Sequence, residues 1–557
     1  MDVDVIVLGT GLTQSITAAA LSKAGFSVAH VDVNPYYGGD DTSLTLDELV
    51  EWADARTHAD DAAAPDAYLS AQRARYTSIS RSSSVLPQQS RQYSVSLAPT
   101  IIPSVGPLIN SLVSSGVSRY GGFKLLEKVA IYDGPGSVKH VPGSKEDVFK
   151  NKDLSLLEKR RLMRFLMFAA GDFADKPELE GKEETPFIQF LRETFSLDQR
   201  TTNALAYALA FCVSASDPTL PALQRVRRYL RSAGRYGASP FLVGHYGGVG
   251  EIAQGFCRTA AVSGAIYILG RRISSDAMDE ISHSLEERTR KHRLKLHDLD
   301  EELKCDLIVS SSDFLPGASL SLSDDIQMEN THAIARGIAI IDRPLSFSTT
   351  EQASNIEPPD PVDYATTDAE QLSPTREQLD TALLVLPPSS LPDGSSTVAV
   401  NILTTGEGSL SAPRGKWIMY ISMPLFEETT RSAEELLRPY LDAALTLAVP
   451  NPDDSAAPLV PLFTLFYTQT PAPSMPSSDS SRSVLGVTDS LPILPEVADS
   501  ATSQAEVLFW KAVELLKGAG CRPRSRKEDD GEEANEEVEI DSFWPPLDMV
   551  DDPSEDW

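Results

Sequence analysis

The sequence predicts an α/β fold into which an all-α domain is inserted, and three observations lead to this prediction. Residues 1–40 follow the order strand, glycine-rich turn, helix and strand. Residues 145–233 repeat apolar positions at helical spacing. Strand-like segments return after residue 236, so the α/β domain is expected in several chain segments. With 557 residues, the chain is long enough for two or three domains and a large core.

The first element of the α/β domain is a βαβ unit. Residues 5–8 are all apolar, as in a strand buried on both faces of a parallel sheet. An Ala-rich helix is expected over residues 15–24, because Gly25 ends the apolar pattern. The second strand covers residues 26–32 and ends in an acid. This order is typical of an FAD/NAD(P)-binding-like (Rossmann-type) domain.

The turn between the first strand and the helix carries part of a dinucleotide fingerprint. Gly9 and Gly11 are two of its three glycines, and Asp32 lies near the expected position of an acid that binds ribose. An FAD or NAD enzyme is therefore one interpretation. Gln14 stands where the third glycine is expected, and its long amide crowds the helix N-terminus that a pyrophosphate would approach. We therefore interpret the motif as vestigial.

Two sequence blocks give this unit a family resemblance. Gly-Thr-Gly-Leu-Thr at 9–13 is followed by His-Val-Asp-Val-Asn-Pro-Tyr-Tyr-Gly-Gly at 30–39. The combination resembles the family of Rab GDP dissociation inhibitors and Rab escort proteins. The resemblance implies a flavoprotein-like scaffold that uses no cofactor and does no redox chemistry, so a binding protein is expected rather than an enzyme.

Composition and motif content argue against several other classes of function. The formal net charge of −31, from 49 basic and 80 acidic side chains, disfavours nucleic acid and anionic lipid headgroups as general partners. Four widely spaced cysteines without a C-x-x-C pair predict neither a disulfide framework nor a metal site. H-E-x-x-H, G-x-S-x-G and Walker A signatures are missing from the sequence. Without a signal peptide, a long apolar run or a prenylation cysteine, a cytosolic protein is expected.

The chain is expected to divide into two domains and several insertions, which are rich in proline, serine, alanine and aspartate. The expected order is a first segment of domain I at 1–50, an irregular insertion at 51–90, domain I continued at 91–140, a helical domain II at 141–235, domain I again at 236–448 with an irregular loop at about 350–374, a low-complexity insertion at 449–505, and a C-terminal helix with an acidic tail at 506–557.

Domain II is predicted to contain four helices. A capping box at residues 155–158 opens a helix that ends near residue 173, and further helices are expected at 185–195, 197–215 and 223–233. Residues 204–211 are apolar nearly all round, which indicates a buried helix. Alternatively, this helix could open to take an isoprenoid.

The block from Tyr246 to Arg258 carries a second resemblance to the family. It is similar to the motif Tyr-Gly-x-Gly-Glu-x-x-Gln-Gly-Phe-x-Arg, with one extra glycine after the tyrosine. The resemblance implies a platform that binds the switch regions of a GDP-bound Rab GTPase and consists of Tyr37, Glu251, Gln254 and Arg258, with Tyr267 nearby. Arg and Tyr are both favoured at interface hot spots. Alternatively, Glu251 and Arg258 are two charges on one solvated helix face.

The block after the first insertion resembles the family's binding region for the Rab C-terminal tail. The apolar residues expected there are Leu97, Ile101, Leu108 and Leu112. Ordinary core packing by the same side chains is the alternative, and the two interpretations are compatible.

A third segment distinguishes the two branches of the family. Escort proteins carry a phenylalanine and an arginine that dock onto the catalytic geranylgeranyltransferase heterodimer, whereas the inhibitors lack that phenylalanine. Phe149 and Arg160 match this pair, and residues 543–547 also resemble escort proteins. By the alternative interpretation, Phe149 is a core residue and Arg160 is a surface charge.

The resemblance therefore implies a non-catalytic escort role. The protein would bind unprenylated GDP-bound Rab, present its C-terminus to the catalytic alpha/beta heterodimer, shield the attached geranylgeranyl lipid and make transient contact with membranes. Two alternatives stay open, namely a GDP dissociation inhibitor that recycles prenylated Rab and, from another class, a flavin-dependent oxidoreductase.

Overall fold

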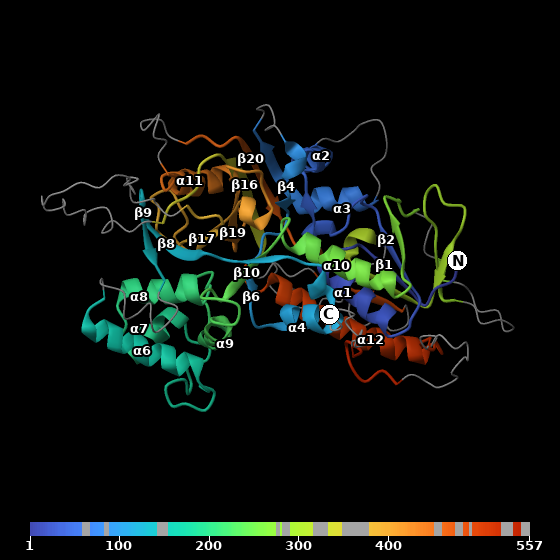
Figure 1. Cartoon of the computed structure of the whole chain (residues 1–557), viewed down its shortest axis with the longest axis horizontal. Helices are drawn as coiled ribbons and strands as arrows, with labels where there is room; N and C mark the ends of the chain where they lie inside the picture. The colour runs from blue at the N-terminus through green and yellow to red at the C-terminus, as the bar shows by residue number, and fades with distance from the viewer. Residues whose placement is uncertain are drawn as a thin grey trace, which may run out of the picture.

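The computed structural model describes residues 1–57, 67–82, 89–141, 154–274, 279–280, 290–315, 332–347, 378–449, 459–473, 483–488, 493–524 and 539–546. Two large sheets, with the helices packed on them, make up most of the molecule, and a separate helical domain lies at one end (Figure 1). Within these ranges, none of the helices combines the length and the apolar character needed to cross a bilayer.

A parallel sheet forms the first half of domain I. Its strand order is β11 (Ile266–Leu269), β2 (Val28–Asp32), β1 (Val5–Leu8), β15 (Leu307–Ser310) and β21 (Val484–Gly486). Val5 and Val7 face the helices α1 (Leu12–Lys23) and α12 (Val497–Gly518). Ile6 and Leu8 face the opposite side, where β13 (His292–Leu294) and β14 (Leu303–Cys305) pack. The uniform apolarity of β1 therefore reflects burial on both faces, and the predicted Rossmann-type fold is confirmed.

An eight-stranded, mainly antiparallel sheet forms the second half of domain I. Its order is β4 (Tyr76–Arg81), β20 (Phe463–Gln469), β16 (Ala333–Ile341), β19 (Trp417–Leu425), β18 (Val400–Thr405), β17 (Ala382–Leu386), β8 (Lys128–Gly134) and β9 (Ser137–His140). Helix α11 (Ala433–Leu445) packs on one face of this sheet (Figure 1).

The remaining elements are smaller strands, helices and 3-10 turns. They are β3 (Ser43–Leu44), β5 (Val95–Ser96), β6 (Ile102–Pro103), β7 (Phe123–Leu125), β10 (Phe241–Gly244), β12 (Asp279–Glu280), α2 (Leu46–Thr57), α3 (Ala67–Arg75), α4 (Pro107–Ser115), α10 (Val249–Val262), and the 3-10 turns η1 (Gly39–Asp41), η2 (Ser90–Gln92), η3 (Val117–Arg119), η5 (Ser312–Phe314) and η6 (Glu407–Ser409). Helix α10 packs beside α1, and α4 packs beside α12 (Figure 1).

The helical domain contains α6 (Leu156–Ala170), α7 (Phe187–Phe195), α8 (Gln199–Asn203) and α9 (Thr219–Ser232). The predicted capping box at the start of α6 is confirmed, since the Ser155 side chain accepts from the Glu158 backbone N–H and the Glu158 carboxylate accepts in return. The helix predicted at 197–215 is shorter than expected, since α8 and the helical turn that continues it cover residues 199–209. Residues 204–209 form a π-helical turn, η4, whose buried residues belong to the core, and the helical run ends before Phe211, which has a left-handed backbone with φ of 53°.

Two segments predicted to be irregular contain regular structure. Within the insertion expected at 51–90, α2 extends to Thr57, and α3 and β4 follow over residues 67–81. Composition was misleading there because polar side chains such as Gln72 and Arg75 are buried and hydrogen-bonded. Within the insertion expected at 449–505, β20 is an inner strand of the eight-stranded sheet, β21 adds the last strand of the parallel sheet, and α12 begins at Val497. The loop predicted near 350–374 and the acidic run lie outside the described residues.

Candidate functional site

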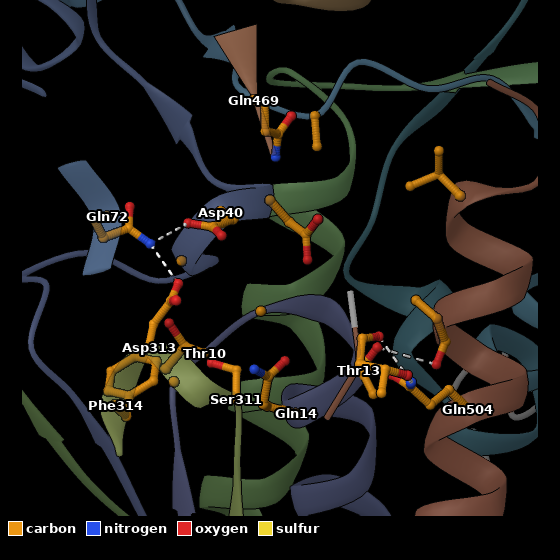
Figure 2. Close-up of a pocket in the computed structure, with 18 of the residues that line it drawn as sticks. Thr10, Thr13, Gln14, Asp40, Gln72, Ser311, Asp313, Phe314, Gln469 and Gln504 are labelled. Atoms are coloured by element: carbon orange, nitrogen blue, oxygen red, sulfur yellow. Dashed lines mark hydrogen bonds between the residues drawn. The ribbon is translucent and has the colours of Figure 1, made fainter. Parts of the chain in front are cut away.

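The Gly9–Gly11 turn is covered by the side chain of Gln14 (Figure 2). A Cβ atom placed on Gly9 would lie 3.3 Å from Gln14 Nε2, and one placed on Gly11 would lie 2.8 Å from Gln14 Oε1. The Gln14 amide therefore lies close to both glycines, and the vestigial role of the motif stays a prediction. A pyrophosphate needs the space beside these glycines to approach the backbone of the turn.

The N-terminus of α1 is capped by the protein itself. Asp41 Oδ2 accepts a hydrogen bond of 2.8 Å from the backbone N–H of Leu12. This carboxylate takes the position at which helix N-termini bind phosphate, since the free N–H groups and the helix dipole both attract an anion. Burial raises the pKa of Asp41 to about 6. The sequence analysis missed Asp41, because nothing in its local pattern indicates that it folds back onto α1.

The acid at the end of β2 has no capacity left for a ribose. Asp32 Oδ2 accepts from the backbone N–H of Thr10 at 2.8 Å and from its hydroxyl at 2.6 Å. Oδ1 accepts from the backbone N–H of Asn34 at 2.8 Å and from its side-chain amide at 2.9 Å. These four donors match the four acceptor positions of a carboxylate. Burial raises the pKa of Asp32 to about 6 in spite of these bonds.

A cavity of about 100 Å³ lies beside the turn, between α1, α3 and the eight-stranded sheet (Figure 2). Its lining includes the acids Asp40, Asp41 and Asp313. Gln72 donates to Asp40 at 3.2 Å and to Asp313 at 2.8 Å, and Arg75 forms ion pairs with the same two carboxylates. Arg336 also lines the cavity, so its lining carries both signs of charge, and the capped N-terminus of α1 is the feature that disfavours the pyrophosphate of a dinucleotide.

The predicted platform residues of α10 lie on one outward side of the helix. Glu251, Gln254 and Arg258 are spaced three and four residues apart, which places them on neighbouring turns. Gln254 and Arg258 are exposed, and Glu251 is half-buried. Burial raises the pKa of the Glu251 carboxyl above its usual value.

Two tyrosines meet next to this helix. Tyr37 comes from the turn after β2 and Tyr267 from β11, and their rings pack edge to face with centroids 5.8 Å apart. Both side chains are half-buried, so each keeps a surface for a partner. Burial raises the pKa of both phenols, and the thiol of Cys257 on α10 adds to the effect. The structure therefore brings the two predicted tyrosines and α10 together.

Close backbone packing holds α10 in place. A Cβ atom on Gly250 would lie 2.6 Å from the backbone nitrogen of Ser43 and 2.9 Å from the carbonyl carbon of Thr42. Only a glycine therefore allows α10 to approach the chain that follows Tyr37. The extra glycine of the motif is accommodated in a turn where Gly247 and Gly248 have φ of 84° and 91°.

An aromatic residue that was not among the predicted site residues lies against Arg258. The guanidinium carbon of Arg258 lies 4.5 Å from the ring centroid of Tyr120, which is 49% exposed. Stacking on an aromatic face keeps a guanidinium planar and pre-oriented. No sequence signal points to Tyr120, because the contact joins the end of η3 to α10.

The four apolar residues predicted to bind a Rab C-terminal tail lie in the core. Leu97, Ile101, Leu108 and Leu112 are at most 2% exposed. Core packing, the alternative interpretation, describes them in this structure. The exposed apolar residue of α4 is Val113, at 51%.

The predicted docking pair is described only in part. Arg160 is exposed on α6, whereas Phe149 lies outside the described residues. The same helix exposes three further apolar residues, Leu156 at 87%, Leu157 at 55% and Met167 at 57%. Exposed apolar side chains next to an arginine are typical of protein interfaces.

Fold and site together define a flavoprotein-like scaffold in which Asp41 caps α1 and the side chain of Gln14 lies beside the glycine turn. The family model described as "GDP dissociation inhibitor" matches residues 1–66 and 67–360. The chain belongs to the GDP dissociation inhibitor family, and the family resemblance predicted from the sequence is confirmed.

Several proteins are similar to this chain in sequence. "Rab proteins geranylgeranyltransferase component A" of Candida albicans is 34% identical over 286 residues, which are 50% of this chain and 43% of the relative. The protein of the same name from Saccharomyces cerevisiae is 34% identical over 273 residues, or 49% of this chain and 44% of the relative. The chain thus matches less than half the length of either. "Rab escort protein 1" of Arabidopsis thaliana is 28% identical over 469 residues, 75% of this chain and 76% of the relative.

Solved structures show the same fold. A Rab GDI from Plasmodium falciparum has a TM-score of 0.59 at 19% identity and covers 92% of this chain and 98% of its own. An oxidoreductase from Methanosarcina mazei has a TM-score of 0.54 at 14% identity, with 91% and 100% covered. The scaffold is thus common to a Rab GDI and an oxidoreductase, so fold alone does not decide function.

Proposed function

We propose that this protein is an escort component of Rab geranylgeranyltransferase, which binds unprenylated GDP-bound Rab GTPases. The observation that carries the proposal is the exposed side of α10, with Gln254 and Arg258, next to the Tyr37–Tyr267 pair. A rigid helix flanked by aromatic residues and a stacked arginine suits a protein partner. The names of the relatives identify the class of partner.

The proposal includes a division of labour between the two domains. Domain I binds the globular part of Rab through Tyr37, Glu251, Gln254, Arg258 and Tyr267, and the Rab tail runs past α4. Helical domain II docks the catalytic alpha/beta heterodimer through Phe149 and Arg160, and exposed apolar residues on the same helix as Arg160 support this role. The chain itself is non-catalytic in this scheme and acts by bringing Rab and the heterodimer together.

Helical domain II would also shield the lipid after its transfer. Burying a geranylgeranyl chain is worth on the order of 10 kcal/mol, so a prenylated Rab needs a carrier in the cytosol and is released only on transient contact with a membrane. The π-helical turn at 204–209 supports this site, since π-turns break the regular packing of a helix and are frequent at functional sites.

The test is a reconstituted prenylation assay with GDP-loaded Rab, geranylgeranyl pyrophosphate and the catalytic heterodimer, with and without this protein. We expect lipid transfer only when the protein is added. Arg258→Ala should lose Rab binding and keep binding to the heterodimer, whereas Arg160→Ala should do the reverse, so each variant controls for the other. Lipid transfer that is independent of the protein would overturn the proposal.

A GDP dissociation inhibitor that recycles prenylated Rab is the second candidate. It is favoured by the description of the matching family model and by the Rab GDI fold. A protein that extracts prenylated Rab from membranes but does not support lipid transfer would establish this candidate.

A further inference from the structure

One buried histidine connects the vestigial dinucleotide turn to the proposed Rab-binding platform. His30 lies in the middle of β2 and is 0% exposed. Its Nε2 atom is 2.5 Å from the carbonyl oxygen of Gly9, and its Nδ1 atom is 3.2 Å from the hydroxyl of Tyr267. Each ring nitrogen therefore has a hydrogen-bond partner, Gly9 for Nε2 and Tyr267 for Nδ1.

The partners determine the tautomer of this ring. A carbonyl oxygen can only accept a hydrogen bond, so Nε2 of His30 carries the proton and donates it to Gly9. The imidazole is neutral, because burial lowers its pKa to about 4. Nδ1 is then an acceptor, and the hydroxyl of Tyr267 must be the donor. The direction of both hydrogen bonds is thus fixed by chemistry.

Strand register strengthens the connection. β2 and β11 are parallel neighbours, and His30 and Tyr267 are paired residues in that ladder. Their rings lie 5.0 Å apart, and the opposite neighbour of the Tyr267 ring is Tyr37 at 5.8 Å. A partly exposed tyrosine held at its hydroxyl and on its ring loses little further freedom when a partner binds.

We propose that His30 is a positioning residue for the partner-binding face, which holds Tyr267, and through it Tyr37, against the carbonyl of Gly9. The turn that binds a pyrophosphate in dinucleotide enzymes would then serve as the anchor of a protein-binding site. This inference rests on the proposed function, since its effect appears as affinity for Rab.

Three variants test it by equilibrium binding of GDP-loaded Rab. Tyr267→Phe removes one oxygen and should weaken binding about fivefold, the equivalent of one net hydrogen bond of about 1 kcal/mol. His30→Leu should weaken it at least as much. His30→Gln should bind nearly as well as wild type, because its amide offers one donor and one acceptor in place of the two ring nitrogens.

The double variant His30→Leu/Tyr267→Phe shows whether the two residues lower the affinity for Rab through a shared contact or independently of each other. Because the Tyr267 hydroxyl also has a hydrogen bond with the Cys257 side chain, the double variant can be weaker than His30→Leu alone, but it should lose less than the sum of the two single variants. Should His30→Leu fail to fold, Tyr267→Phe and His30→Gln still decide the question, because both keep the core volume. Thermal unfolding and heterodimer binding serve as folding controls.

The outcomes distinguish this inference from the proposed function. If Arg258→Ala binds Rab as tightly as wild type, the platform itself is wrong and the inference falls with it. If Arg258→Ala weakens binding while Tyr267→Phe and His30→Leu do not, the platform stands and the positioning role of His30 is overturned. Full additivity in the double variant would overturn it as well.

Discussion

Asp41 Oδ2 lies 2.8 Å from the backbone nitrogen of Leu12 and accepts its hydrogen bond at the start of α1. A carboxylate from the same chain thus sits where dinucleotide-binding proteins hold a phosphate. The side chain of Gln14 lies beside the same glycine turn, which borders a cavity of about 100 Å³. The surface that we propose for a partner lies on α10 and the two tyrosines beside it, where Gln254 and Arg258 are exposed.

We predict that the protein does not bind FAD. Asp41 and Gln14 fill the pyrophosphate position, and all four acceptor positions of Asp32 are occupied. Titration of purified protein into FAD should leave the flavin fluorescence unchanged, and the protein should show no flavin absorbance. Saturable quenching would contradict this reading and favour the oxidoreductase alternative.

Gly250→Ala should displace α10 and weaken Rab binding. The added Cβ would lie 2.6 Å from the backbone nitrogen of Ser43, and a backbone contact of this kind cannot be relieved by a side-chain rotation. Overpacking of this type costs about 1–3 kcal/mol of unfolding free energy. Chemical denaturation measures the loss in stability, and a binding titration measures the loss in affinity.

Gly518→Ala is the matched control. An added Cβ at this position near the end of α12 has no atom within 4 Å. Alanine is the better helix former by up to about 1 kcal/mol, so this variant should be as stable as wild type or slightly more stable. Equal losses in the two variants would show that the contact with Ser43 is not the cause.

His30 should make stability depend on pH in a defined direction. Its pKa is about 4 in the folded protein and 6.5 in the unfolded chain, so the unfolded chain binds the extra proton first as pH falls. Above pH 6.5 His30 is neutral in both states and does not lower the free energy of unfolding. Between pH 6.5 and pH 4 the free energy of unfolding falls, and the loss is about 2 kcal/mol at pH 5. We therefore expect His30→Gln to gain stability relative to wild type as pH falls from 7 to 5.

Only the difference between wild type and His30→Gln isolates this effect. Burial raises the pKa values of Asp32 and Asp41 to about 6, so these two residues favour the folded state as pH falls. They therefore oppose the loss of stability that His30 causes. Denaturant titrations of both proteins at pH 5, 6 and 7 provide the measurement. A difference that is constant over this range would refute the pKa assignment.

Phe149→Ala and Arg160→Ala should each weaken binding to the catalytic heterodimer by about 2 kcal/mol, or roughly 30-fold, if both residues are interface hot spots. Arg192→Ala, an exposed arginine on α7, is the control and should bind as wild type does. Surface plasmon resonance with immobilised heterodimer measures the three affinities. Unchanged binding of Phe149→Ala would remove the main support for the escort branch over the inhibitor branch.

Trp544→Ala should destabilise the docking of the C-terminal segment. The indole stacks on Phe256 of α10 with centroids 5.8 Å apart, and its Nε1–H donates to the hydroxyl of Ser111 on α4 at 3.1 Å. Because Trp544 is half-buried, we expect a loss of about 2 kcal/mol in unfolding free energy. Trp544→Phe keeps the stacking and should lose only about 1 kcal/mol, the value of the hydrogen bond. If both variants lose the same unfolding free energy, the hydrogen bond alone accounts for the stabilisation by Trp544.

The sequence predicts local structure correctly where residues close together in the chain determine that structure. The βαβ unit, the crowding by Gln14 and the capping box at Ser155 all follow from residues close together in the chain. The prediction failed for β20, an apolar strand within a proline- and serine-rich region. Its neighbours β4 and β16 supply the pairing, and they lie more than 100 residues away in sequence.

The sequence by itself determined the fold class, the family and the candidate residues of the platform, because these depend on short motifs and on periodicity. Tertiary structure alone decided that Leu108 and Leu112 are core residues, that Asp41 caps α1 and that Arg258 stacks on Tyr120. Each of these facts is a contact between segments far apart in the chain. No local pattern encodes such contacts, because they form only when the sheet brings the segments together.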